Sequence, residues 1–319
     1  MANNGRKITN SFNDGTILNE TGMTFFEAIQ RSEFLVLDGA LGTELTRRGI
    51  KLELPLWTAN AVLQNPKAII SIYSDYLKAG ADILTTATYR TDALTFTQAG
   101  LSMKQAEEAT HQAVDLVREA ITYLRPVCPI WIAGSIAPLA DCYRPQDAPD
   151  FATALRIHRQ RAAWLADSGV DFCLLETMNN LKEARAATVA ALATGLPVFT
   201  SFILDENGRI LSGEDFFQAM AEIKMLGVTG LGINCTHHSI ISAFLKKYPG
   251  QLDLPWIFYA NTGFYSSANG WRADAEFTPQ NFAKIATDWL KAGAKIIGGC
   301  CGTTPDYIKA LADIRKSPE

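Results

Sequence analysis

Three cysteines lie in two short segments where thiol side chains could do chemistry. Cys300 and Cys301 are adjacent and lie between glycines in the run Gly-Gly-Cys-Cys-Gly, and Cys235 follows Gly-Ile-Asn. Such thiols could bind a metal ion, do redox chemistry, or be small apolar side chains. Three thiolates bind Zn²⁺ well and leave one tetrahedral position open, as in a catalytic zinc site. The pattern favours such a site if the fold brings the two segments together.

The other cysteines have simpler interpretations. We interpret Cys173 and Cys128 as small buried side chains, because a lone cysteine most often behaves as a small hydrophobe. Cys142 falls in an expected loop and could lie near the site. A disulfide between Cys300 and Cys301 is an open alternative, which a reducing compartment disfavours.

Two carboxylates and two histidines also fall at informative places. Asp38 and Glu176 each end an apolar run. Taken singly, each is more often structural, but two carboxylates that face one pocket shift the balance towards function. His237 and His238 follow Cys235, and they could be metal ligands or, equally, solvated or capping residues at the start of a helix.

Eight apolar runs must position these side chains. Each run is short and nearly continuous, as is typical of parallel strands that are buried on both faces. The expected strands cover residues 34–38, 82–86, 130–134, 171–176, 197–202, 230–235, 256–261 and 294–298. Segments with helical spacing lie between them, and a repeated pattern at 78–83, 167–172 and 291–296 joins a helix end, a glycine cap and a strand start.

Strands that alternate with helices predict a single-domain α/β protein with a (β/α)8 fold, the TIM barrel. A doubly wound sheet is the alternative, which is less favoured because no Gly-x-Gly-x-x-Gly motif follows the first strand. In a TIM barrel the active site lies at the C-terminal ends of the strands, so the sixth and eighth strands can bring their thiols together. Segments 41–55 and 137–150 are expected to be loop elaborations.

Composition narrows the class of protein further. The chain has 319 residues, of which 48% are hydrophobic and 19% charged, as is typical of a globular protein. Its net charge of −4 argues against nucleic-acid binding through a basic surface. No apolar run is long enough to cross a membrane, and the polar N-terminus lacks the apolar core of a secretory signal. We therefore expect a cytoplasmic protein, with a loose polar arm at 1–20 and a barrel domain at 21–319.

Four segments resemble the homocysteine S-methyltransferase family. This family includes S-methylmethionine-dependent enzymes, betaine–homocysteine methyltransferase and the homocysteine domain of cobalamin-dependent methionine synthase. The segments are Asp-Gly-Ala-Leu-Gly-Thr-Glu-Leu at 38–45, Leu-Leu-Glu-Thr-Met at 174–178, Gly-Ile-Asn-Cys-Thr at 232–236 and Gly-Gly-Cys-Cys-Gly-Thr at 298–303. The resemblance extends from about residue 35 to the C-terminus, and the two cysteine motifs together are its most specific part.

The resemblance implies a zinc enzyme that moves a methyl group from a sulfonium donor, S-methylmethionine or S-adenosylmethionine, to homocysteine and so makes methionine. It implies that Zn²⁺ is held by Cys235, Cys300 and Cys301, with the homocysteine thiol as the fourth ligand. The substrate-binding residues that it implies are Asp38 and Glu176 for the amino group, the amides of Gly39 and Ala40 for the carboxylate, and Asn234 as a support for the first ligand.

The methyl donor is the most open part of this prediction. Cation–π contacts suit a sulfonium group, and Tyr89, Trp57 and Tyr143 are candidates in the expected loops. The sequence departs from the family at 137–144 and at 259–261, where Tyr-Ala-Asn replaces the usual Tyr-Pro-Asn. Two alternatives are a related zinc methyltransferase with a betaine-like donor or another thiol or selenol acceptor, and a barrel that keeps only a structural or redox-sensing thiol cluster.

Overall fold

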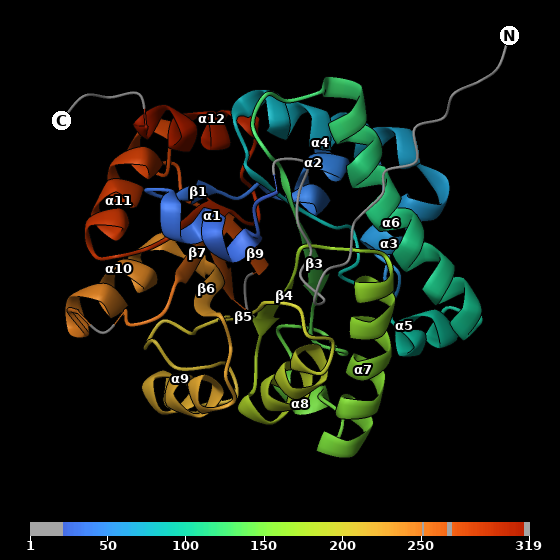
Figure 1. Cartoon of the computed structure of the whole chain (residues 1–319). Helices are drawn as coiled ribbons and strands as arrows, with labels where there is room; N and C mark the ends of the chain where they lie inside the picture. The colour runs from blue at the N-terminus through green and yellow to red at the C-terminus, as the bar shows by residue number, and fades with distance from the viewer. Residues whose placement is uncertain (1–21, 251, 267–269, 316–319) are drawn as a thin grey trace, which may run out of the picture.

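The computed structural model describes residues 22–250, 252–266 and 270–315, so the predicted arm at 1–20 lies outside the described residues. Within these ranges the chain forms one barrel of parallel strands with helices packed around it (Figure 1). The predicted fold class is confirmed.

The barrel strands follow the predicted apolar runs closely. They are β1 Leu35–Val36, β2 Ile83–Thr85, β3 Trp131–Ile136, β4 Phe172–Met178, β5 Val198–Phe202, β6 Gly230–His237, β7 Trp256–Asn261 and β10 Ile296–Gly299. They pair in parallel in the order β1-β10-β7-β6-β5-β4-β3-β2. A parallel bridge between Leu37 and Ile83, with a hydrogen bond of 3.0 Å from the Asp38 amide to the Ile83 carbonyl, joins the two end strands.

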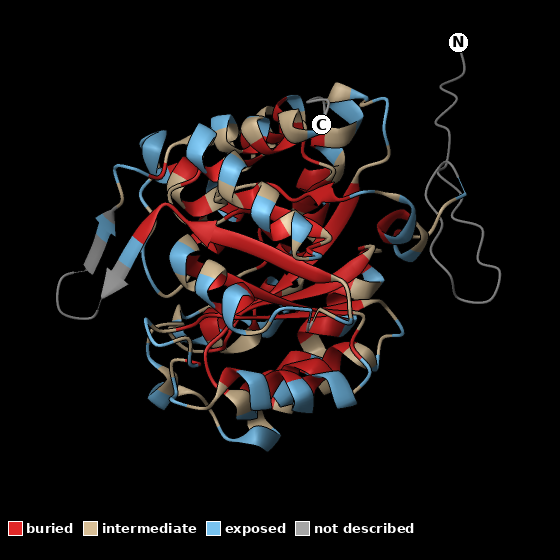
Figure 2. Ribbon diagram, turned by 90° about the vertical axis from the view of Figure 1, so that its left-hand side faces the viewer, coloured by how far each residue is buried: buried red, intermediate tan, exposed pale blue. Residues whose placement is uncertain are grey.

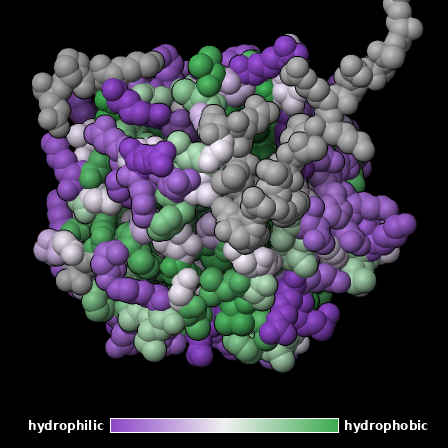
Figure 3. Space-filling model, viewed as in Figure 1, coloured by the Kyte–Doolittle hydropathy of each residue, from purple (hydrophilic) through white to green (hydrophobic). Residues whose placement is uncertain are grey.

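Helices surround the strands and fill the connections between them. They are α1 Phe25–Arg31, α2 Leu41–Arg47, α3 Thr58–Gln64, α4 Pro66–Ala79, α5 Ala93–Gln98, α6 Met103–Leu124, the 3-10 turn η1 Pro145–Asp147, α7 Phe151–Asp167, α8 Leu181–Leu192, α9 Phe216–Met225, α10 His238–Lys247, α11 Pro279–Lys291 and α12 Pro305–Ile314. In Figure 2 the buried strands run through the molecule between helices whose outer faces are exposed. Hydrophilic and hydrophobic side chains are interspersed on the face in Figure 3.

Glycines end several of the outer helices, as the repeated sequence pattern predicts. Gly80, Gly169 and Gly293 have φ angles of 100°, 70° and 107°, a left-handed conformation that glycine adopts without a steric penalty. Each one turns the chain from the end of a helix towards the next strand. This turn sets where each strand begins and therefore where its polar C-terminal end lies.

Helix α1 covers the N-terminal end of the barrel. A capping box between Thr24 and Glu27 starts the helix. Phe25 stacks on Phe172 with ring centroids 4.1 Å apart, and it also contacts Trp131, whose ring centroid lies 5.5 Å away. Because Phe172 and Trp131 begin β4 and β3, this apolar cluster fills one mouth of the barrel. The opposite mouth holds the polar strand ends.

Three features differ from the sequence-based expectations. Segment 41–55 is not simply a loop, because α2 occupies its first half and buries Leu45. Cys128 is exposed rather than buried, because α6 ends at Leu124 and the chain then crosses the surface to β3. A two-stranded antiparallel sheet, β8 Gly263–Ser266 and β9 Gly270–Ala273, follows β7 and projects at the left in Figure 2. Among the described residues, no helix is long and apolar enough to cross a membrane.

Candidate metal and substrate site

A cavity of about 360 Å³ opens at the C-terminal end of the barrel. Residues from the ends of strands far apart in the sequence line it, including Asp38 after β1, Glu176 in β4, Cys235 in β6 and Cys300 after β10. The predicted thiols and carboxylates therefore face one cavity, as expected for the C-terminal face of a TIM barrel.

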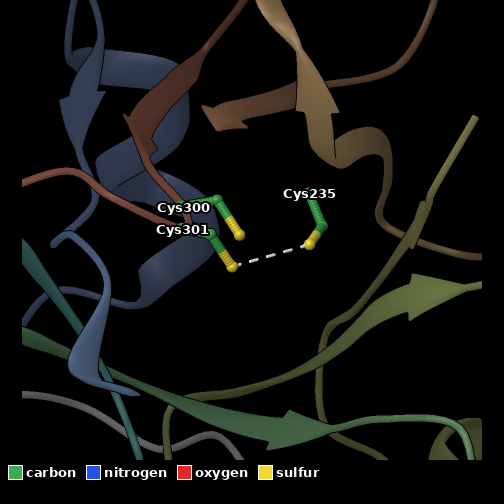
Figure 4. Close-up of side chains that lie close together, drawn as sticks. All are labelled: Cys235, Cys300 and Cys301. Atoms are coloured by element: carbon green, nitrogen blue, oxygen red, sulfur yellow. Dashed lines mark hydrogen bonds between the residues drawn. The ribbon is translucent and has the colours of Figure 1, made fainter. Parts of the chain in front are cut away.

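The three thiols converge on one point of this cavity (Figure 4). The sulfur atoms of Cys235, Cys300 and Cys301 all lie within 4.8 Å of one another, and the Cys235 and Cys301 sulfurs are 3.9 Å apart. Cys173 is buried in β4 as predicted, and it lies outside this group. The sheet order places β7 alone between β6 and β10, so the strand ends that carry the thiols lie close enough for the thiols to meet.

Local backbone conformation turns the thiols inward. Cys235 has a φ of 51°, and the pairing of β6 with β7 shifts register between Asn234 and His237. Gly302 follows the cysteine pair with a φ of 85°, and a Cβ atom there would lie 1.9 Å from the Thr262 hydroxyl oxygen. Only glycine fits this turn, which lets both adjacent cysteines face the cavity rather than opposite sides of a strand.

The thiol group fits a tetrahedral zinc ion. A Zn–S bond of about 2.3 Å in a tetrahedron gives a sulfur–sulfur separation of about 3.8 Å. The 3.9 Å between Cys235 and Cys301 agrees with this separation. Hydrogen bonds among the three thiols hold the pKa of Cys301 well below its usual range and raise the pKa values of Cys235 and Cys300, so the metal-free cluster favours a single thiolate at Cys301.

Asn261 holds the two thiol segments together, although it was not among the predicted site residues. Its Nδ2 atom donates to the Cys235 carbonyl at 2.8 Å, and its Oδ1 atom accepts the Cys301 amide at 3.1 Å. Asn261 is 2% exposed and ends β7, the strand between the two ligand-bearing strands. That position in the strand order is the signal that could have identified it.

The two carboxylates are buried and share the cavity. Asp38 accepts the Thr85 amide and the Thr85 hydroxyl, each at 2.9 Å, and Glu176 accepts the Ser135 hydroxyl. Burial raises the pKa of Asp38 to about 8 and that of Glu176 to about 7, and the charge of Glu176 adds to the shift at Asp38. A positively charged ligand between them would favour ionisation of both groups.

The first βα turn is closely packed. A Cβ atom on Gly39 would lie 2.8 Å from the Tyr76 ring and 2.9 Å from the Thr303 hydroxyl, so the backbone needs glycine to approach them. The Ala40 amide already donates to the Thr303 hydroxyl at 3.2 Å. Of the two amides that were predicted to bind the substrate carboxylate, that of Ala40 is therefore already hydrogen-bonded to a protein side chain.

Asn234 lies behind the cavity as a link between strands. Its Oδ1 atom accepts the Thr177 amide at 2.7 Å and the Ser201 hydroxyl at 2.8 Å, and its Nδ2 atom donates to the Thr177 hydroxyl at 2.8 Å. It is fully buried. Asn234 thus joins β6 to β4 and β5, and any support for Cys235 comes through the backbone of β6.

Aromatic side chains from the loops form the upper wall of the cavity. The Tyr89 and Trp57 rings meet edge to face with centroids 5.4 Å apart, and the Tyr143 hydroxyl lies 3.5 Å from the Cys235 sulfur. Cys142 lines the same cavity, where burial raises its pKa to about 12. All four side chains come from loops above the strand ends.

The two adjacent histidines form a separate polar group. His237 caps α10, and its Nε2 atom lies 3.1 Å from a carboxylate oxygen of Asp274. The Nε2 atom of His238 lies 3.6 Å from the same oxygen. Within the part of the chain that the structure describes, the histidines group with Asp274 rather than with the thiols, so the capping interpretation holds for His237.

The chain is similar to known proteins over most of its length. The sequence model of the homocysteine S-methyltransferase family matches residues 35–315. The chain is 33% identical to the homocysteine S-methyltransferase of Escherichia coli (strain K12), covering 89% of this chain and 96% of that protein. It is 31% identical to the selenocysteine methyltransferase of Astragalus bisulcatus, covering 90% and 94%. Its fold matches the metallated form of the E. coli homocysteine methyltransferase MmuM with a TM-score of 0.79 and 30% identity, covering 91% and 98%.

Proposed function

This chain belongs to the homocysteine S-methyltransferase family, and we propose that it transfers a methyl group from a sulfonium compound to the sulfur of homocysteine, with Zn²⁺ as its cofactor. The observation that carries this proposal is the convergence of three thiols and two buried carboxylates in one cavity. A structural zinc site has four protein ligands, whereas this group offers three and leaves room for a substrate sulfur.

Cys235, Cys300 and Cys301 would hold the ion. Zinc on three thiolates supplies a homocysteine sulfur that is deprotonated at neutral pH and still nucleophilic. Asn261 keeps the two ligand segments in register through its hydrogen bonds to Cys235 and Cys301. The formal negative charge of the thiolates also attracts a cationic donor into the cavity.

Asp38 and Glu176 would bind the ammonium group of homocysteine. Thr85 and Ser135 fix these carboxylates by hydrogen bonds, so their oxygens point to a defined place in the cavity. The raised pKa values mean that burial disfavours both charges in the free enzyme. An ammonium ion removes that penalty, which gives selectivity for an amino-acid thiol over a simple thiol.

The transfer itself balances without a further reactant. The thiol proton of homocysteine passes to solvent before attack. The homocysteine sulfur then forms the new bond to the methyl carbon, and the donor S–CH₃ bond breaks. The bonding electron pair stays on the donor sulfur, which departs as a neutral thioether. With S-methylmethionine as donor, both sulfur products are methionine. The Tyr89 and Trp57 rings offer faces that stabilise the sulfonium cation by cation–π contact.

A selenol acceptor is a second candidate. The similarity to the Astragalus selenocysteine methyltransferase favours it. A selenol ionises more readily than a thiol, and the same ammonium-binding carboxylates would serve selenocysteine. The same cavity can therefore serve both acceptors, and their relative kcat/KM values decide between them.

The test is a methyl-transfer assay on the zinc-loaded protein. Homocysteine is combined with S-methylmethionine, S-adenosylmethionine or betaine, methionine is measured, and selenocysteine replaces homocysteine in a parallel set. We expect transfer from a sulfonium donor and about one zinc per chain. Full activity of zinc-free protein, or no product from homocysteine with any donor, would overturn the proposal.

A further inference from the structure

Arg90 is a buried cation that the proposed chemistry has not used. It lies on the loop between β2 and α5, lines the cavity, and is 8% exposed. Its Nε atom is buried without a hydrogen-bond partner. Among the described residues, no carboxylate forms an ion pair with its guanidinium, whose central carbon lies 5.9 Å from the centroid of the Tyr89 ring.

A second buried arginine nearby shows what a structural role looks like. Arg161, which is 1% exposed, donates to the Ala137 carbonyl at 2.8 Å, the Thr88 carbonyl at 3.0 Å and the Tyr89 carbonyl at 3.3 Å. Those bonds tie the loops after β2 and β3 to α7. Arg90 makes no comparable bonds in the described structure, so packing does not account for it.

The carboxylates near Arg90 are already engaged. Asp92 caps α5, accepting the Thr95 amide at 2.8 Å and the Thr95 hydroxyl at 2.6 Å. Asp141, which lines the same cavity, accepts the Tyr143 amide at 2.9 Å. A buried cation without a paired anion is costly, so this position is suited to an anion that arrives with a ligand.

We propose that Arg90 binds the carboxylate of the methyl donor, an inference that rests on the proposed methyl transfer. A sulfonium or betaine donor derived from an amino acid carries a carboxylate in addition to its cationic methyl-bearing centre. Arg90 receives that carboxylate while the adjacent Tyr89 and Trp57 rings receive the cation. The guanidinium also repels a methyl donor that lacks a carboxylate, because two cations would then share a cavity of low dielectric.

The height of Arg90 in the barrel separates it from the homocysteine groups. Asp38 lies two residues after the end of β1 and Glu176 lies within β4, so both belong to the floor of the cavity. Arg90 lies five residues beyond Thr85, the last residue of β2, in the layer of Tyr89 and Trp57. A donor must approach the homocysteine sulfur from above this floor, which places its carboxylate near Arg90.

The test combines a protein change with a donor change. S-Methylmethionine is compared with its decarboxylated analogue, 3-aminopropyl dimethylsulfonium, on zinc-loaded wild-type protein and on Arg90→Met. We expect removal of the donor carboxylate to raise the KM of the wild type about 10- to 100-fold, as for loss of one charge-assisted pair. Arg90→Met should raise the KM for S-methylmethionine by a similar factor. It should lower the KM for the analogue, because the guanidinium no longer repels this carboxylate-free cation.

Further readouts keep this test decisive. Arg90→Lys should recover part of the lost affinity, whereas the KM for homocysteine and the zinc content should not change. Three results would overturn the inference. Arg90→Met could raise the KM for both donors equally, or the wild type could show the same KM for both donors. The third is an Arg90→Met protein in which only the KM for homocysteine changes. If Arg90→Met does not fold, the wild-type donor comparison and Arg90→Lys still decide the matter.

The proposed function can fail separately. If the wild type transfers no methyl group from any donor to homocysteine, calorimetric titration of the zinc-loaded protein with S-methylmethionine and with the analogue still measures carboxylate recognition. If wild type binds S-methylmethionine and the analogue equally well, and Arg90→Met does the same, the assignment of Arg90 is overturned independently of catalysis.

Discussion

The side-chain nitrogen of Asn261 donates a hydrogen bond of 2.8 Å to the carbonyl oxygen of Cys235. Because the Asn261 oxygen accepts the Cys301 amide at 3.1 Å, one buried amide group fixes the backbones of both thiol segments. Groups that orient metal ligands in this way commonly matter almost as much as the ligands themselves.

Asn261→Ala should therefore weaken zinc binding about 10- to 100-fold without removing a thiol. Competition with a chromophoric chelator measures the affinity, and activity should recover as free zinc is raised. The exposed Asn207→Ala is the matched control and should behave as wild type. Unchanged zinc affinity in Asn261→Ala would mean that strand pairing alone holds the thiols in place.

Cys301→Ser should lose both bound zinc and methyl transfer, because a serine hydroxyl is a far poorer zinc ligand than a thiolate. Elemental analysis and the assay with homocysteine measure the two losses. Cys128→Ser removes an exposed thiol and should keep wild-type zinc content and rate. A Cys301→Ser protein that retains one zinc and full activity would contradict the three-thiol site.

Asp38 should make the substrate-free protein less stable as the pH rises. Its pKa is about 8 in the folded state and near 3.8 in an unfolded chain, so the folded state holds an extra proton between these values. Between about pH 6 and pH 8, wild type should lose on the order of 2 kcal/mol of unfolding free energy relative to Asp38→Asn.

Urea unfolding of the substrate-free wild type and of Asp38→Asn at several pH values measures this difference. Using the difference between the two proteins cancels the titration of groups they share. A gap between the two proteins that stays constant across this pH range would show that Asp38 is ionised throughout in the folded state. Homocysteine should reduce the pH effect in wild type by pairing with the carboxylate.

Ser135→Ala should move the acidic limb of the pH profile of kcat/KM for homocysteine to higher pH. The Ser135 hydroxyl donates to Glu176 and lowers its pKa, so its removal raises that pKa above the present value of about 7. Ser212→Ala, which alters an exposed hydroxyl bonded to Glu214, is the control. A uniform loss of rate with an unmoved limb would count against an ionised Glu176 in substrate binding.

Arg161→Met should destabilise the fold by roughly 3 kcal/mol or more, because three carbonyl groups in the interior lose their donor. The exposed Arg159→Met on the same helix should change stability by less than about 0.5 kcal/mol. Urea unfolding measures both. Equal stability of the two variants would show that water or backbone movement satisfies the carbonyls that Arg161 binds.

Local patterns were enough to predict the barrel. A parallel strand buried on both faces must be apolar along its length, so runs such as 197–202 and 256–261 are visible one at a time. The expected strand at 256–261 coincides with β7. Such a strand can be recognised from its apolar run alone, without knowledge of any tertiary contact. Helix α2 and the β8–β9 hairpin escaped prediction, because short elements carry little periodic signal and depend on their packing.

The amino-acid sequence by itself determined which residue types stand at the strand ends, among them Asp38, Glu176 and the cysteines at 235, 300 and 301. Only the tertiary structure decided which of these groups meet. The 3.9 Å between the Cys235 and Cys301 sulfurs depends on the order of β6, β7 and β10 around the barrel. The different states of Arg90 and Arg161 depend on which carbonyls the loops present. The meeting of the thiols and the hydrogen bonding of the two arginines both depend on contacts between residues far apart in the sequence. No local spacing in the chain encodes such contacts.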